Sequence, residues 1–140
     1  MHDRILPDTN VLAEVWNARG NARVRAAFGP AADRALMSVI VLGEIFRGVR
    51  QLPASRRRDA LAGYYLGLVR NHSEAILPVT LAVAETWGAI TASARARGRV
   101  LPPSDGLIAA TALVHELTLW TRNTGDFAGT GVRLFNPWED

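Results

Sequence analysis

The chain has 140 residues, of which 49% are hydrophobic and 21% charged, a balance that fits one globular domain with its own core and excludes a wholly disordered chain. It contains no cysteine, so disulfides, zinc–thiolate centres, iron–sulfur clusters and thiolate nucleophiles are excluded. All sixteen cationic side chains are arginine, which excludes lysine-based catalysis, and the net charge of +3 permits nucleic-acid binding without requiring it.

The first half of the chain alternates strand and helix patterns. We expect a strand over residues 4–8, a helix over 11–18, a strand over 35–37 and a helix over 39–50 for which Ser38 supplies the N-cap. Residues 42, 45, 46 and 49 of the latter helix are apolar and share one face. Pro53 opens the next helix, whose apolar stripe runs through residues 61, 64, 65, 68 and 69.

The second half continues the alternation. A strand over 75–79 precedes a long helix that Thr80 caps and Gly98 ends. After the break at Pro102-Pro103, Ser104 caps a helix from 105 to 116, and strands follow over 117–121 and 132–135. This order predicts one α/β domain with a parallel sheet, and such sheets bind ligands at the carboxyl ends of their strands. No apolar run reaches the roughly 18 residues of a membrane span and no signal peptide opens the chain, so we expect a cytoplasmic protein.

Four carboxylates fall near this predicted edge of the sheet. Asp8 follows the first strand, Asp126 follows the fourth, Asp105 begins a helix, and Glu44 lies on the helix after the second strand. Clustered carboxylates repel each other and lose solvation, which is unfavourable unless a cation neutralises them. Oxygen ligands of this kind suit Mg²⁺ or Mn²⁺, which can activate water and neutralise the charge on a phosphate.

Each carboxylate also has a purely structural interpretation. Asp8 can cap the following helix through an Asx turn, and Asp105 suits the positive end of a helix dipole. Glu44 can be a solvated side chain paired with Arg47, and Asp126 can belong to an ordinary turn. Only the joint placement of the four favours a metal site over these alternatives.

A series of short segments, taken in chain order, resembles the PIN-domain ribonucleases, specifically the VapC-type toxins of bacterial toxin–antitoxin pairs, including the FitB-like branch. The series spans nearly the whole chain: Asp8-Thr9-Asn10-Val11-Leu12, Gly43-Glu44-Ile45-Phe46-Arg47-Gly48, Gly98-Arg99, Leu101-Pro102, Asp105-Gly106-Leu107-Ile108-Ala109-Ala110-Thr111-Ala112, Thr121-Arg122-Asn123, Asp126-Phe127 and Asn136-Pro137-Trp138. No single segment is specific, whereas the whole series in this order and spacing is a strong signal.

The resemblance implies a PIN domain over residues 1–140, with a five-stranded parallel sheet of order 3-2-1-4-5 flanked by helices. It implies a catalytic Mg²⁺ or Mn²⁺ site made of Asp8, Glu44, Asp105 and Asp126. It implies polar support for that site from Thr9, Asn10, Thr121 and Asn123. The implied activity is metal-dependent hydrolysis of RNA phosphodiester bonds that leaves a 5′-phosphate, with DNA as a lesser alternative substrate.

The resemblance also implies partners. These are a VapB-type antitoxin, operator DNA bound through that antitoxin, the RNA substrate, and a second copy of the chain in a homodimer. Arg47 and Arg50 share the helix of Glu44 and are candidates for contacts to RNA phosphates. Two denser arginine groups, at residues 56–58 and at residues 95, 97 and 99, are equally well interpreted as solvated helix faces.

One residue departs from the family pattern. Pro7 stands where the family usually has a β-former, and proline donates no ladder hydrogen bond, so it predicts that pairing of the first strand ends early and that Asp8 shifts. This departure keeps open a second function, a catalytically inactive PIN domain that serves as a binding or assembly module with its antitoxin on DNA. A third route, histidine-based cleavage through the RNA 2′-hydroxyl, has only His2, His72 and His115 available, which are far apart in sequence.

Overall fold

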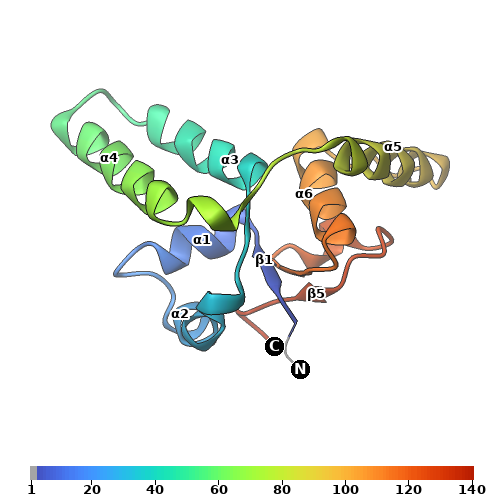
Figure 1. Ribbon diagram of the computed structural model, residues 1–140, viewed down its shortest axis with the longest axis horizontal. Helices are drawn as coiled ribbons and strands as arrows, with labels where there is room; N and C mark the ends of the chain where they lie inside the picture. The colour runs from blue at the N-terminus through green and yellow to red at the C-terminus, as the bar shows by residue number, and fades with distance from the viewer. Residues whose placement is uncertain (1–2) are drawn as a thin grey trace.

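Short parallel strands form two small sheets in the computed structural model, which describes residues 3–140 (Figure 1). Strands β1 (Ile5–Pro7), β4 (Thr118–Trp120) and β5 (Leu134–Phe135) form one sheet in the order β1-β4-β5. Strands β2 (Met37–Ser38) and β3 (Ile76–Leu77) form the other. Every pair is parallel, so the prediction of an α/β domain with parallel strands and flanking helices is confirmed.

A continuous five-stranded sheet of order 3-2-1-4-5 is not confirmed. The two sheets meet at a single bridge between Ile5 of β1 and Ala35, where the N–H of Leu36 donates to the carbonyl of Ile5 at 2.9 Å. Backbone groups of alternate strand residues point to opposite neighbours, so Pro7 faces the same side as Ile5. Proline has no N–H to continue that ladder, which explains why the pairing stops after one bridge.

The expectation that Pro7 ends the pairing of the first strand early is correct on the side of β2 and wrong on the side of β4. Pro7 is itself a strand residue, in register with Trp120 of β4. The N–H of Asp8 donates to the carbonyl of Trp120 at 2.8 Å, so the pairing with β4 continues past the proline. Pro7 thus occupies the outer side of an edge strand of the β1-β4-β5 sheet, which is where proline is tolerated.

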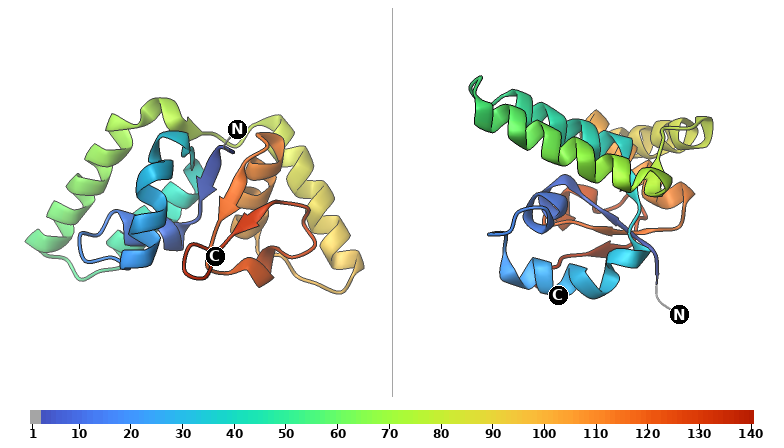
Figure 2. Two further views of the ribbon diagram at one scale, coloured as in Figure 1. Left: turned by 90° about the horizontal axis from the view of Figure 1, so that it is seen from below. Right: turned by 60° about the vertical axis from the view of Figure 1, so that its left-hand side comes forward.

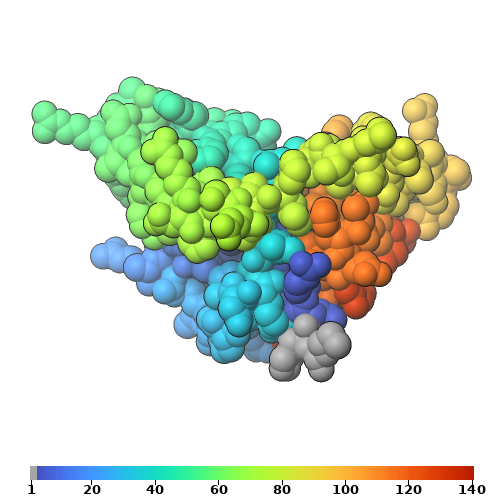
Figure 3. Space-filling model, in the orientation of Figure 1, coloured from blue at the N-terminus to red at the C-terminus, as the bar shows by residue number. Residues whose placement is uncertain are grey.

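Six α-helices connect and cover the strands in the described residues: α1 (Thr9–Val15), α2 (Ala22–Phe28), α3 (Val39–Arg50), α4 (Arg56–Asn71), α5 (Leu81–Ala96) and α6 (Pro103–Val114). Helix α3 has the bounds that the sequence predicts and is capped by Ser38, whose side chain accepts from the N–H of Ile40. Thr80 caps α5, also as predicted. Figures 1 and 3 show α3 and α4 extending together to one side of the strands, and α5 and α6 lying toward the other.

Two expectations about the helices are wrong. Pro53 does not open α4, because the helix begins at Arg56 and the side chain of Ser55 accepts from the N–H of Arg58. Ser104 does not cap α6, which begins one residue earlier at Pro103. Helix α2 and the 3-10 segment η1 (Gly29–Arg34) are two further elements, both short, for which the sequence patterns make no prediction.

Two hydrophobic clusters cover the two faces of the β1-β4-β5 sheet. Leu6 and Leu119 contribute to the cluster shared with α3 and α6, whereas Ile5 and Trp120 contribute to the cluster shared with α2. Figure 2 shows the strands between these layers of helices. Helix α1 supplies Leu12 to the first cluster and Val11 and Val15 to the second, which fixes the turn from β1 into α1 and therefore the position of the residues in that turn.

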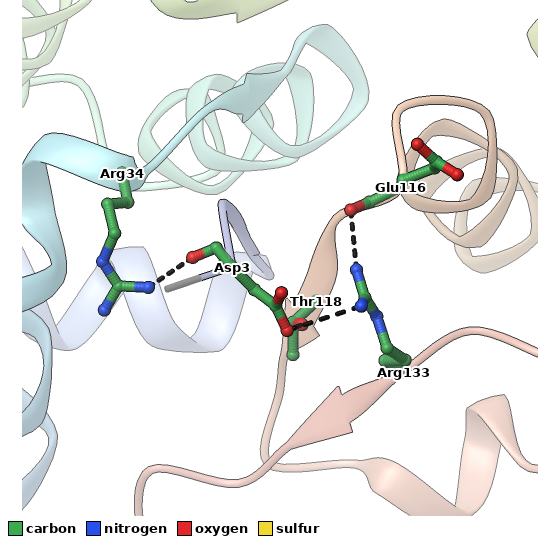
Figure 4. Close-up of polar contacts among 5 residues, drawn as sticks. All are labelled: Asp3, Arg34, Glu116, Thr118 and Arg133. Carbon is green, nitrogen blue, oxygen red and sulfur yellow. Dashed lines mark hydrogen bonds and ion pairs between the residues drawn. The ribbon is translucent and has the colours of Figure 1, made fainter. Parts of the chain in front are cut away.

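A polar network joins the segments that precede the strands (Figure 4). Arg133 Nη1 lies 3.4 Å from Asp3 Oδ2, and Arg133 Nη2 donates to the carbonyl of Glu116 at 2.7 Å. Thr118 and Arg34 complete the network, each donating to an oxygen of Asp3. Because the strands are parallel, this network marks the end of the sheet opposite to the edge where the sequence predicts the site. No helix among residues 3–140 combines the length and the apolar character needed to cross a membrane.

Candidate functional site

Asp8 lies at the carboxyl end of β1, in the turn that leads into α1. Its side chain is only 6% exposed. One carboxylate oxygen, Oδ1, accepts from the N–H of Thr9 at 2.8 Å and caps α1, while the other, Oδ2, accepts from the hydroxyl of Thr121 at 2.8 Å. The helix cap that the sequence offered as an alternative is therefore real, and it leaves the second oxygen directed at the end of β4.

Glu44 is joined to the same turn. The hydroxyl of Thr9 donates to Oε1 of Glu44 at 2.6 Å, which links the start of α1 to the middle of α3. No ion pair between Glu44 and Arg47 occurs in the described part of the chain, so the interpretation of Glu44 as half of a solvated pair is not supported. Glu44 is partly buried, as expected of a side chain that lies between two helices.

Asp105 and Asp126 approach from the other two elements that the sequence singled out. Asp105 lies in the first turn of α6 and is partly buried, and Asp126 lies exposed on the 3-10 segment η3 (Thr124–Phe127) that follows β4. Burial, together with the negative charges of Asp8, Glu44 and Asp126, raises the pKa of Asp105 to about 6. Asp105 therefore feels the charges of the other three carboxylates.

The pKa of Asp8 is set by opposing causes. Burial raises it above its ordinary value, and the hydrogen bonds from Thr121 and Thr9 lower it. The charges of Glu44 and Asp126 raise it further. The net effect is a raised pKa, which means that the protein holds this carboxylate in its charged form at some expense in stability.

The supporting residues contribute unequally. Thr121 is fully buried and, besides donating to Asp8, accepts from the N–H of Asn123 at 3.1 Å. Asn10 accepts from the N–H of Arg122 at 3.3 Å, which ties α1 to the segment after β4. Asn123 makes its contact through its backbone only, and its side chain is exposed, so its predicted support of the carboxylates remains untested.

The donor chemistry of this group fits a hard divalent cation. Asp8, Glu44, Asp105 and Asp126 offer carboxylate oxygens, which Mg²⁺ and Mn²⁺ prefer. In residues 3–140 no arginine forms an ion pair with any of the four, although the chain has sixteen cationic side chains. Within the described residues, no three or more histidine, aspartate or glutamate side chains lie close enough together to coordinate one metal ion as they stand.

The histidines do not form an alternative centre. His72, at the end of α4, contacts the carbonyl of Leu68 through Nδ1 at 2.7 Å. His115 follows α6, and its buried Nε2 has no partner within the described residues. His2 lies outside the residues that the structure describes. The two described histidines form no hydrogen bond with each other or with the four carboxylates, so the histidine route gains no support.

Comparison with known proteins shows which family the chain resembles and which proteins are similar to it over nearly its whole length. Residues 5–131 match the family described as PIN domain. The chain is 33% identical over 140 residues to VapC ribonuclease Y4jK of Sinorhizobium fredii, covering 96% of this chain and 98% of that protein. It is 34% identical over 138 residues to toxin FitB of Neisseria gonorrhoeae, covering 97% and 99%. The structure of FitAB bound to an IR36 DNA fragment superposes with a TM-score of 0.89 at 33% identity, covering 97% and 96%.

Proposed function

The chain belongs to the PIN-domain family, and on that premise we propose that it is a metal-dependent endoribonuclease that acts as the toxin of a VapBC-type toxin–antitoxin pair. The observation that carries the proposal is the buried Asp8 carboxylate, held by Thr121 and by the N–H of Thr9, whose hydroxyl in turn holds Glu44. The charges of Glu44 and Asp126 act on Asp8, all three act on Asp105, and no arginine is paired to any of the four within residues 3–140. Such an arrangement is unfavourable without a cation, and a bound divalent cation would supply the activated water that phosphodiester hydrolysis requires.

Asp8, Glu44, Asp105 and Asp126 would hold Mg²⁺ or Mn²⁺. When bound, such an ion lowers the pKa of water and neutralises negative charge on a phosphate. The chain's own part is to hold the carboxylates charged and oriented. Thr121 and Thr9 do this for Asp8 and Glu44 through hydrogen bonds of 2.8 and 2.6 Å, and both hydroxyls favour the ionised carboxylate.

RNA binding is assigned to α3. Arg47 and Arg50 are exposed on the helix that carries Glu44, and neither side chain is engaged in a hydrogen bond or ion pair with the described residues. Free arginines beside a carboxylate site suit the phosphates that flank a cleaved bond. Their removal should flatten the dependence of RNA affinity on salt by about 0.7 in log–log slope for each phosphate that is no longer neutralised.

The partners follow from the relatives. FitAB was solved bound to DNA, and we propose that this chain likewise pairs with a small antitoxin, reaches operator DNA through it, and forms a homodimer. The proposed place of action is the cytoplasm, where the RNA is. Light scattering on the isolated 15.2 kDa chain tests the dimer, which a purely monomeric species would refute.

Cleavage of total RNA by the purified, partner-free chain tests the activity. We expect cutting in Mg²⁺ or Mn²⁺ that stops in EDTA and in the Asp8→Asn and Asp105→Asn variants. Asp33→Asn, an exposed aspartate on η1, is the matched control and should cut normally. The products should carry 5′-phosphates, and 2′,3′-cyclic phosphates would contradict the metal mechanism.

One observation favours the second candidate, a catalytically inactive PIN domain that serves as a binding module with its antitoxin on DNA. The described carboxylates form no ready coordination cluster. This candidate predicts a folded, partner-free chain that binds neither metal nor RNA and cuts nothing. Calorimetric titration with Mn²⁺ separates the two, because only the nuclease should take up the ion.

A further inference from the structure

The position of Asp126 depends on how the backbone of its loop is held. Asp126 is exposed on the short segment η3, and no side chain caps the amino end of that segment. Phe127, which is 2% exposed, fixes the inner side of the loop in the core. Gly125, Ala128 and Gly129 are exposed, so the hydrogen bonds to their carbonyls help to fix where the Asp126 carboxylate lies.

Two arginines that follow the carboxyl end of α5, Arg97 and Arg99, donate these hydrogen bonds. Arg99 donates from Nη1 to the carbonyl of Ala128 at 2.9 Å and from Nη2 to the carbonyl of Gly125 at 3.0 Å. Arg97 donates from Nη2 to the carbonyl of Gly129 at 3.1 Å. The guanidinium of Arg99 thus spans η3 and is bonded on both sides of the residue that carries the carboxylate. A planar fork of donors suits such a double contact, and an ammonium group does not.

The local backbone brings both arginines to the loop. Helix α5 ends in a Schellman motif, with the N–H of Arg99 bonded to the carbonyl of Ala94 at 2.9 Å and Gly98 in the left-handed region at φ 75°. This reversal directs the side chains on either side of Gly98 to one surface. On the other segment Gly129 has φ 82°, and a Cβ there would lie 2.8 Å from Nη1 of Arg97. The two segments are therefore fitted closely to each other.

We propose that Arg99, assisted by Arg97, is a positioning residue that fixes Asp126 for cation binding. The inference rests on the proposed nuclease function. Neither arginine forms an ion pair with Asp126 in the described part of the chain. The hydrogen bonds of Arg97 and Arg99 to the loop carbonyls, which we call the clamp, therefore order the loop and leave the carboxylate charge available to a cation. It also removes two members from the arginine group at residues 95, 97 and 99 that the sequence offered for RNA phosphates or for a solvated face.

The test compares Arg99→Lys, Arg99→Ala and the control Arg95→Ala. Arg95 is an exposed arginine in the last turn of α5 whose side chain makes no hydrogen bond with the described residues. This control therefore removes one positive charge and leaves the hydrogen bonds of Arg97 and Arg99 to the loop intact. We expect both Arg99 variants to weaken Mn²⁺ affinity by on the order of ten-fold. The electron paramagnetic resonance signal of free Mn²⁺ measures this affinity. We also expect faster amide exchange at Asp126 and Ala128, unchanged RNA affinity in EDTA, and cleavage that recovers at high Mn²⁺.

Three results would overturn the inference. One is Mn²⁺ affinity of Arg99→Lys equal to that of the wild type, because lysine cannot reproduce the fork. A second is a loss of RNA affinity in EDTA with normal exchange, which would make Arg99 an RNA ligand. A third is a loss of Mn²⁺ affinity in Arg95→Ala equal to that in the Arg99 variants, which would show that the removed positive charge, and not the lost hydrogen bonds, causes the effect. If the wild type binds no Mn²⁺, the proposed function fails instead, and the exchange rates alone decide whether Arg99 holds the loop.

Discussion

Thr121 and Asp8, which are 113 residues apart in sequence, share a buried 2.8 Å hydrogen bond in which the hydroxyl donates to Oδ2. The same hydroxyl oxygen accepts from the N–H of Asn123, which orients the hydroxyl so that its proton is donated to Asp8. This arrangement joins the ends of β1 and β4 and ties the first carboxylate of the site to the segment that leads to the last.

Thr121→Val should therefore destabilise the protein, although valine has nearly the same size and shape as threonine. The substitution keeps the shape but leaves Oδ2 of the buried Asp8 carboxylate and the Asn123 N–H each without a partner, which predicts a loss of about 2 kcal/mol in the free energy of unfolding. Urea unfolding at pH 7 in EDTA measures it. Thr118→Val, at the partly exposed start of the same strand, is the control and should change stability by less than about 0.5 kcal/mol. Equal losses in the two variants would contradict the role of the Thr121 hydroxyl.

The metal-free protein should lose stability as pH rises from 4 toward 7. In the fold, the pKa of Asp105 is raised from 3.8 to about 6, so the folded state binds a proton there that the unfolded state has already released. Its favourable contribution is complete below the unfolded pKa and is lost as pH rises through the folded pKa. We expect a fall on the order of 1 kcal/mol from Asp105, since solvent screening of this half-exposed group reduces the full linkage value.

Urea unfolding in EDTA between pH 4.5 and 7.5 checks this slope. Asp105→Asn should remove most of it, whereas Asp33→Asn, an exposed aspartate elsewhere, should leave it in place. Saturating Mg²⁺ should also flatten the slope, because a bound cation favours the ionised carboxylates. A stability that rises over this pH range in EDTA would show that burial does not govern Asp105.

The candidate site was the part of this protein most accessible from the sequence. Asp8 and Asp126 follow strands, Asp105 begins a helix, and Glu44 lies within the helix after the second strand. Because parallel strands bring their carboxyl ends to one edge, a joint placement of these carboxylates could be argued from the order of the elements. The contacts that orient them could not. The bonds from Thr121 to Asp8 and from Thr9 to Glu44 depend on side-chain directions at a corner between elements, which no periodicity encodes.

The same limit applies to Pro7 and Arg99. Whether a proline disrupts a strand depends on which neighbour its missing N–H would have faced, and here that neighbour is β2 and not β4. Arg99 stands among other arginines, and nothing in the sequence separates a side chain that clamps a loop from one that is solvated. Helix α2 escaped prediction for another reason: it is seven residues long, too short for a periodic signal to stand out.

Pro7→Val should leave the site working. Because the N–H of Asp8 pairs with Trp120 on the side away from the proline, restoring an N–H at position 7 changes only the edge toward β2. We expect Mn²⁺ affinity and RNA cleavage within about two-fold of the wild type. Calorimetry and a cleavage assay measure the two quantities, with Asp8→Asn as the inactive reference. A gain in cleavage of an order of magnitude or more would instead show that Pro7 restrains the enzyme and would favour the inactive binding module for the natural sequence.

Glu116→Gly should stabilise the protein. Helices α5 and α6 end in the same Schellman motif, and the left-handed position is Gly98 in the first but Glu116, at φ 55°, in the second. A side chain is unfavourable there, and after allowing for the greater freedom of glycine in the unfolded chain we expect a gain of about 0.5–1 kcal/mol.

The gain should appear as a higher urea midpoint with an unchanged slope. Glu116→Ala is the matched control: it removes the same carboxylate but keeps a Cβ, so it should bring no gain. Both variants retain the backbone carbonyl that accepts from Arg133 (Figure 4), so neither disturbs the network at this end of the sheet. If alanine stabilised as much as glycine, the benefit would come from removing the charge, and the left-handed backbone would not be the cause.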